Sequence, residues 1–158
     1  MIIDYFKVEL AQSQSLAIAL EKTAEVLTLQ RSEICPVPGV RPELLGVSNQ
    51  RGKLLWFVDL SAILQIASPS LQSSRREKVT AIVLSSENLR VAGVVANLKG
   101  IIDLDPKDFQ PHPHPCLLAQ TTLDDSPLRI LDVESIFQTL QLTDTTQTLT
   151  TKTLITVN

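Results

Sequence analysis

Apolar residues in this chain come in short runs that polar or proline-rich segments interrupt. Residues 5–10 alternate apolar and polar side chains with a period of two, as a strand with one buried face does. Apolar runs at 16–20, 79–84 and 89–95 predict further strands, and Gly93 within the last run indicates a bulge or a close contact. Helical periodicity is rare, so we expect about nine or ten short strands. The predicted fold class is mostly β, in small barrels.

The most informative stretch is 46–64, GVSNQRGKLLWFVDLSAIL. It predicts a strand, a tight turn at Arg51-Gly52, a second strand over 54–58 and then a short helix. Gly52 suits such a turn because glycine adopts positive φ without a steric penalty. Asp59 ends the apolar run and is a favourable N-cap for the helix, since its carboxylate can accept backbone N–H bonds.

The same pattern occurs a second time, at an offset of 73 residues that takes Val58 to Leu131. The match holds without a gap from residues 38–64 to residues 111–137. An internal repeat predicts two similar structural halves, and Asp132 is then the N-cap of a second helix. The halves differ at the turn, where Asn49-Gln50-Arg51-Gly52 is matched by Thr122-Leu123-Asp124-Asp125. A specialised surface is therefore expected on the first half.

The overall composition limits the possible partners and compartments. The chain has 158 residues, a net charge of −3 and an isoelectric point near 5.3, which argues against nucleic acid because such proteins usually carry a basic face. No signal peptide and no apolar segment long enough to span a membrane is recognisable. We therefore expect a cytoplasmic protein that is not embedded in the membrane. The Thr-rich tail, 143–158, is either disordered or an added edge strand.

Few residues have the spacing that catalysis or metal binding needs. His112 and His114 lie close to Cys116, but third and fourth ligands at usable spacing are absent, so we interpret them as residues of a proline-rich loop. Cys35 and Cys116 are expected to be free thiols, because two cysteines do not form a disulfide framework. We expect no cofactor, no metal and no enzymatic activity.

Two residues of the central stretch are candidates for partner binding. Trp56 is the only tryptophan; it is either a core residue or an exposed anchor, since tryptophan is enriched at interface hot spots. Arg51 stands at the turn with its guanidinium fork on a fixed backbone, which suits a carboxylate or carbonyl of a partner. The alternative for Arg51 is an ion pair within the chain.

The central stretch resembles the CheW-like chemotaxis adaptor family in an ordered set of positions: Gly46, Asn49, Arg51-Gly52, the apolar run and Asp59-Leu60. The resemblance implies two packed, five-stranded SH3-like β-barrels with short helices, covering residues 1–142. We expect the first barrel at roughly 14–66 and the second at roughly 77–142, completed by the N-terminal strand.

The resemblance also implies a function in signal transduction. Family members are non-enzymatic adaptors that couple the cytoplasmic tip of a methyl-accepting chemoreceptor to the regulatory domain of a CheA-type histidine kinase. By position, the implied partner-binding residues are Thr23, Glu25, Asn49, Arg51, Gly52 and Trp56. The sequence departs from the usual pattern at Thr23, Gln50 and Trp56, and an Arg-Gly followed by a Trp strand resembles adaptors of type IV pilus motility or phototaxis. The alternative function is a module that binds a response regulator.

Overall fold

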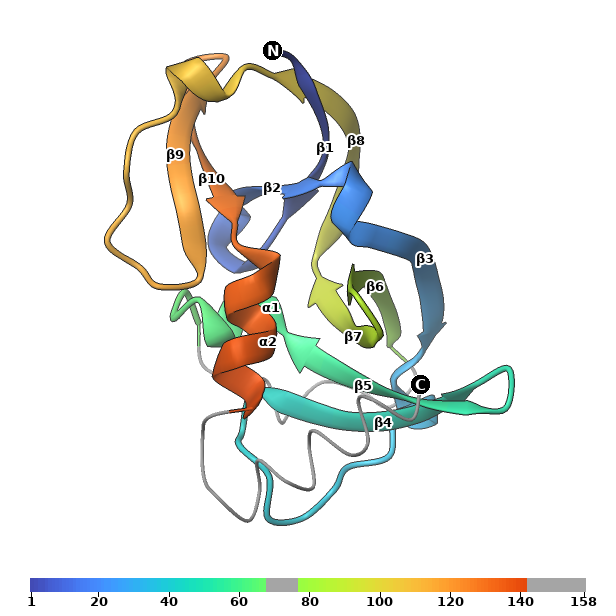
Figure 1. Cartoon of the computed structure of the whole chain (residues 1–158). Coiled ribbons are helices and arrows are strands. Elements are labelled where there is room, and N and C mark those ends of the chain that lie inside the picture. The colour runs from blue at the N-terminus through green and yellow to red at the C-terminus, as the bar shows by residue number, and fades with distance from the viewer. Residues whose placement is uncertain (68–76, 142–158) are drawn as a thin grey trace.

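In a computed structural model, residues 1–67 and 77–141 are described, and their strands form two five-stranded sheets (Figure 1). The strands are β1 (Ile3–Glu9), β2 (Ser15–Ala19), β3 (Thr23–Gln30), β4 (Leu44–Gln50), β5 (Lys53–Asp59), β6 (Lys78–Ser86), β7 (Leu89–Val95), β8 (Asn97–Leu104), β9 (Leu117–Leu123) and β10 (Ser126–Leu131). The α-helices are α1 (Leu60–Ile63) and α2 (Val133–Gln141), and the 3₁₀ turns are η1 (Ala11–Ser13), η2 (Leu20–Lys22), η3 (Arg31–Glu33) and η4 (Pro106–Asp108). The predicted mostly-β fold class is confirmed.

The two sheets use the chain differently. One has the order β3-β6-β7-β5-β4 and is continuous in sequence, so we call it the continuous barrel. The other has the order β8-β1-β2-β10-β9, and we call it the split barrel because its strands come from both ends of the chain. In Figure 1 the split barrel occupies the upper half of the molecule and the continuous barrel the lower half.

This division differs from the expected barrels, roughly 14–66 and roughly 77–142 with the N-terminal strand, although β1 does lie in the split barrel with β8, β9 and β10. Strands β6 and β7 belong to the continuous barrel, whereas β2 belongs to the split barrel. The physical reason is the β1–β2 hairpin, which takes the place in the split barrel that the β6–β7 hairpin takes in the continuous one. In both sheets the second strand of that hairpin pairs in parallel, β7 with β5 and β2 with β10. Local sequence patterns do not reveal such long-range pairing.

The predicted repeat is present in the fold. An offset of 73 residues superimposes the bounds of β4 on those of β9 and the start of α1 on the start of α2. Asp59 Oδ1 accepts a hydrogen bond from Ala62 N at 3.2 Å, and Asp132 Oδ1 accepts one from Ser135 N at 3.1 Å. Both predicted helix caps are therefore confirmed.

The buried side chains form three clusters. One fills each barrel, and the third and largest lies between the barrels. Strand β5 contributes to two of them, because Leu55 and Phe57 pack inside the continuous barrel while Trp56 and Val58 pack between the barrels. Helix α2 adds its buried face, Val133, Ile136, Phe137 and Leu140, to the cluster between the barrels. The two barrels thus share one hydrophobic core.

Several local expectations can be compared with the structure. Gly93 is closely packed, since a Cβ there would lie 2.8 Å from Leu60 Cδ1. Cys35 and Cys116 are free thiols, the first exposed and the second buried. None of the described helices is long and apolar enough to cross a bilayer. The Thr-rich tail, 143–158, lies outside the described residues.

Candidate interaction surface

The β4–β5 hairpin presents Arg51 at a tight turn. Gln50 pairs with Lys53, so Arg51 and Gly52 are the two loop residues, with φ angles of 55° and 84°. Positive φ at both positions is the geometry of a type I′ turn, whose twist matches the flanking strands. The Oδ1 of Asn49 accepts a hydrogen bond from Gly52 N at 2.8 Å and fixes the turn. The predicted turn is therefore confirmed.

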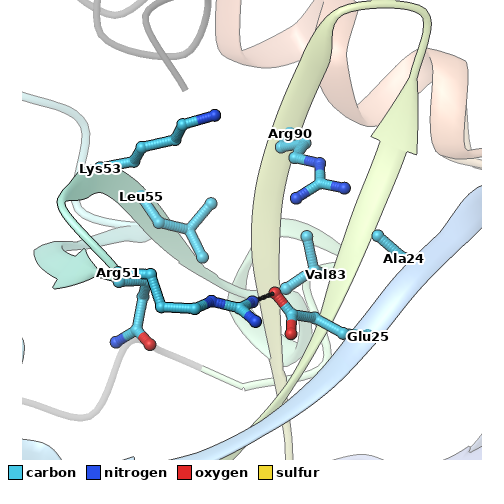
Figure 2. A pocket seen from close by; sticks show the side chains of 8 residues that line it. Ala24, Glu25, Arg51, Lys53, Leu55, Val83 and Arg90 are labelled. Carbon is cyan, nitrogen blue, oxygen red and sulfur yellow. Dashed lines mark hydrogen bonds and ion pairs between the residues drawn. The ribbon is translucent and has the colours of Figure 1, made fainter.

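Arg51 reaches from this turn to the opposite edge strand of the sheet. Its Nη2 forms an ion pair with Oε1 of Glu25 on β3 (Figure 2). The Arg51 side chain is 75% exposed and that of Glu25 is 29% exposed. An exposed pair of this kind contributes only about 0–1 kcal/mol to stability. Its larger consequence is to fix two charged groups at the surface in a defined arrangement.

The ion pair borders an open depression of about 430 Å³. Figure 2 shows Lys53 and Arg90 on the side opposite the Arg51–Glu25 pair. Leu55 and Val83 supply an apolar floor, and the residues that line the depression carry three cationic side chains against one carboxylate. Such a surface suits an acidic group that is flanked by apolar side chains, because charge complementarity and apolar contact act together.

Comparisons with known proteins identify the family and the fold of this chain. The sequence profile of the CheW-like domain family matches residues 4–141. The chain belongs to the CheW-like domain family. Among solved structures, it is similar to the scaffolding protein TtCheW from Thermoanaerobacter tengcongensis, with a TM-score of 0.70 and 18% identity, over 83% of this chain and 89% of that chain. A search of curated protein sequences found no match.

At that identity the structural likeness establishes the fold alone, which is the pair of SH3-like barrels that the resemblance implied. The family assignment rests on the sequence profile. Neither comparison tests which residues of this CheW-like chain touch a partner. The roles of Glu25, Asn49, Arg51 and Gly52 therefore stay predictions.

Trp56 requires a correction. Its side chain is completely buried in the cluster between the barrels, so it cannot serve as an exposed anchor for a partner in this fold. Its indole Nε1 is buried and has no hydrogen-bond partner among the described residues. The physical reason is that β5 is covered on both faces, so the alternation that normally distinguishes buried from exposed positions is absent.

Thr23 and Asn49 lie near the surface but are engaged within the chain. Thr23 begins β3, and its hydroxyl donates to Leu20 O at 2.7 Å, which closes η2. Asn49 is exposed, although its Oδ1 is engaged in the turn. We therefore regard Asn49 as a residue that shapes the turn and Thr23 as one that starts the strand.

Six lining residues were not predicted from sequence as site residues: Ala24, Gln50, Lys53, Leu55, Val83 and Arg90. Arg90 comes from β7, which the parallel β5–β7 ladder brings beside the hairpin. The sequence does contain a feature that points to Lys53 and Arg90, because both are cations near the starts of otherwise apolar strands. Over residues 1–67 and 77–141, the structure contains no group of three or more His, Cys, Asp or Glu side chains that could hold a metal ion.

Proposed function

We propose that this chain is a non-enzymatic adaptor of a chemotaxis-type signalling system, which couples chemoreceptor tips to a CheA-type histidine kinase. Membership of the CheW-like family supports the adaptor class. The observation that carries the surface assignment is the depression with Arg51, Lys53 and Arg90 around it. We propose that these three side chains, with Glu25, receive an acidic segment of the partner.

The Arg51–Glu25 pair suits a surface that exchanges partners. Because the pair is exposed, breaking it costs the chain little, and Arg51 can turn its guanidinium to a carboxylate of a partner. Glu25 then remains on the same depression, which Arg90 and Lys53 also line. This arrangement gives charge complementarity, which affects association rate and specificity more than it affects affinity.

Calorimetric titration with the kinase regulatory domain tests the proposal. We expect micromolar binding by the wild type and a loss of about tenfold or more for Arg51→Glu, since removing a hot-spot contact costs about 2 kcal/mol. Lys107→Glu is the matched control: it makes the same charge change at an exposed site of η4 and should bind like the wild type. Melting temperatures of both variants should stay close to that of the wild type, because both side chains are exposed.

Two outcomes would oppose the proposal. A large fall in melting temperature for Arg51→Glu would make Arg51 structural. Failure of the wild type to bind either a kinase regulatory domain or a receptor tip would contradict the coupling function. Binding to an isolated receiver domain alone would favour the alternative, a module that acts on a response regulator. The departures from the family pattern at Thr23 and Trp56 suggested this alternative.

The pilus or phototaxis branch stays a prediction. It depends on Trp56, which contributes to the core rather than to a recognition surface. Assigning a pathway therefore requires identifying the kinase that binds.

A further inference from the structure

A second pocket, of about 330 Å³, lies at the junction of the two barrels. It shares no lining residue with the depression at Arg51. Its polar side chains come from the η1 loop, from the segment after α1, from the proline-rich loop and from β10: Gln12, Gln14, Gln65, His112, His114 and Arg129. No aspartate or glutamate lines it. The pocket is therefore polar and free of negative charge.

Arg129 supplies a positive charge to this pocket. The residue is half-buried, and its Nη1 donates to Oε1 of Gln14. Among the described residues, no carboxylate lies within ion-pair distance of it. Partly buried charges are usually paired, because removing them from water is unfavourable. The pocket therefore presents a positive charge that no described carboxylate neutralises.

The two histidines add neutral donors. Nδ1 of His112 accepts a hydrogen bond from His114 N at 3.0 Å, and Nδ1 of His114 accepts one from Cys116 N at 3.0 Å. In the neutral ring, an accepting Nδ1 places the proton on Nε2. Burial and the neighbouring His112 lower the pKa of His114, which favours this neutral form. Each ring therefore keeps one N–H donor that no described residue uses.

At the corresponding place beside the continuous barrel, a carboxylate of the chain itself neutralises the cation. The offset of 73 residues matches His114 with Arg41 and Cys116 with Glu43. Arg41 is paired with the Glu43 carboxylate at 3.0 and 3.1 Å and also donates to Thr139 O at the end of α2. The residue that replaces this glutamate in the repeat is Cys116, which is buried in the cluster between the barrels and supplies no carboxylate.

Two further differences distinguish the junction pocket from its counterpart. The offset matches Arg129 with Trp56, whose indole is packed in the core. Helix α1 ends at Ile63, whereas α2 continues to Gln141. After α1 the chain turns at Gln65, which has a φ of 63°, and Gln12 across the pocket has a φ of 59°. Non-glycine residues in this conformation are uncommon and cluster at ligand sites.

We propose that the junction pocket binds a compact oxyanion from solution, of the phosphate or carboxylate type. The Arg129 fork makes the charged contacts, and the histidine and glutamine N–H groups complete the shell. The lining comes from both barrels, so a bound oxyanion also stabilises their packing by mass action.

Nuclear magnetic resonance titration tests this proposal directly. His112 and His114 are the only two histidines of the chain, so their ring resonances report on the pocket without ambiguity. Inorganic phosphate, and acetate in a second titration, are added at constant ionic strength against chloride. We expect saturable shifts of both rings at roughly millimolar concentrations. Saturation by phosphate alone indicates a site for a dianion, and saturation by both indicates a general oxyanion site.

Variants distinguish a site from general charge effects. Arg129→Gln should weaken binding about tenfold or more, because hydrogen bonds to charged groups are strong, and Arg129→Lys should retain part of it. Lys99→Gln, on β8 beside Glu9 and outside the pocket, should bind like the wild type. Thermal melting confirms that each variant is folded, and phosphate should raise the melting temperature of the wild type more than that of Arg129→Gln. Shifts that do not saturate, or equal binding by Arg129→Gln and Lys99→Gln, would overturn the proposal.

Discussion

The continuous and split barrels have the same strand arrangement and different surface chemistry. Each is a five-stranded sheet in which the last strand of one hairpin pairs in parallel with a strand of another. Each also ends its repeated hairpin with an Asp-capped helix. The continuous barrel takes its strands from the middle of the chain, whereas the split barrel takes them from both ends. Strand pairing and helix capping thus determine the common scaffold. The candidate functional residues are side chains that differ between the barrels at matched positions.

The two hairpin turns show this most clearly. Arg51-Gly52 and Asp124-Asp125 are matched by the repeat, and all four residues have positive φ. The backbone of the turn is therefore the same in both barrels. Of these four residues, only Arg51 forms an ion pair with another described residue, Glu25 on the opposite edge strand, and borders the depression with Lys53 and Arg90. The same type of turn thus carries Arg51 of the proposed recognition surface in one barrel and two acidic residues in the other.

The largest expected difference between the barrels lies at Trp56 and its counterpart Arg129. Trp56→Ala should lower the free energy of unfolding by about 3–5 kcal/mol, because a large, fully buried side chain leaves a cavity. Arg129→Ala should cost about 1 kcal/mol, since Arg129 is half-buried and loses mainly its bond to Gln14. Urea unfolding measures both. Equal losses would show that the two positions are packed alike.

A smaller effect on stability is expected where the two barrels differ in the sizes of the side chains that pack between strand and helix. Gly93 packs against Leu60, and the repeat matches Leu60 with Val133. Gly93 pairs with Val58, which the repeat matches with Leu131. The β10–β2 ladder ends at the pair Ile130 and Ala17, and continuing it by one residue places Ile18 opposite Leu131, so Ile18 is the counterpart of Gly93. A large residue on the helix thus accompanies a small one on the strand, and the reverse holds in the split barrel.

Gly93→Ala should therefore lower the free energy of unfolding by about 1–3 kcal/mol, because the added methyl group overpacks a buried leucine. Combining it with Leu60→Val should cost less than the sum of the two single changes, by about 0.5 kcal/mol or more, since residues in contact are coupled. A double-mutant cycle in urea provides the measurement. Strict additivity would mean that Leu60 moves aside without strain.

Much of the fold could be predicted from local sequence. The turn at Arg51-Gly52, the caps Asp59 and Asp132 and the 73-residue repeat depend on short-range chemistry, and the structure contains all of them. The barrel boundaries could be predicted only in part: the N-terminal strand was expected in the second barrel, but the pairing of β2 with β10 and of β3 with β6 joins segments far apart in the sequence.

The candidate sites were harder to predict. Arg51 and Glu25 were identified, but Arg90 joins them only through the parallel β5–β7 ladder. Trp56 was ambiguous because β5 is buried on both faces. His112 and His114 were interpreted as plain loop residues, since their relation to Arg129 depends on how the proline-rich loop returns to β10.

The smallest expected effect concerns the contact that each helix makes with the opposite barrel. The repeat matches Ser61 on α1 with Glu134 on α2. The hydroxyl of Ser61 accepts from Ala11 N at 3.0 Å, whereas Glu134 accepts from Lys22 at 2.9 Å and from Ser86 at 2.5 Å. Both contacts link helix and barrel, but only the second one is ionic.

The Ser86 hydroxyl and the Lys22 ammonium lower the pKa of Glu134 below its ordinary value of 4.5. A lowered pKa in the folded state means that the contribution of Glu134 to stability is present above the unfolded pKa and is lost as pH falls through the folded pKa. Glu134→Gln should therefore lower the free energy of unfolding at neutral pH by less than about 1 kcal/mol, because the pair is exposed. The difference from the wild type should vanish in acid. Ser61→Ala removes a neutral contact and should lower the free energy of unfolding equally across the same pH range. If the free energy of unfolding of Glu134→Gln and of the wild type changed in parallel with pH, the ion pair would contribute nothing to joining the barrels.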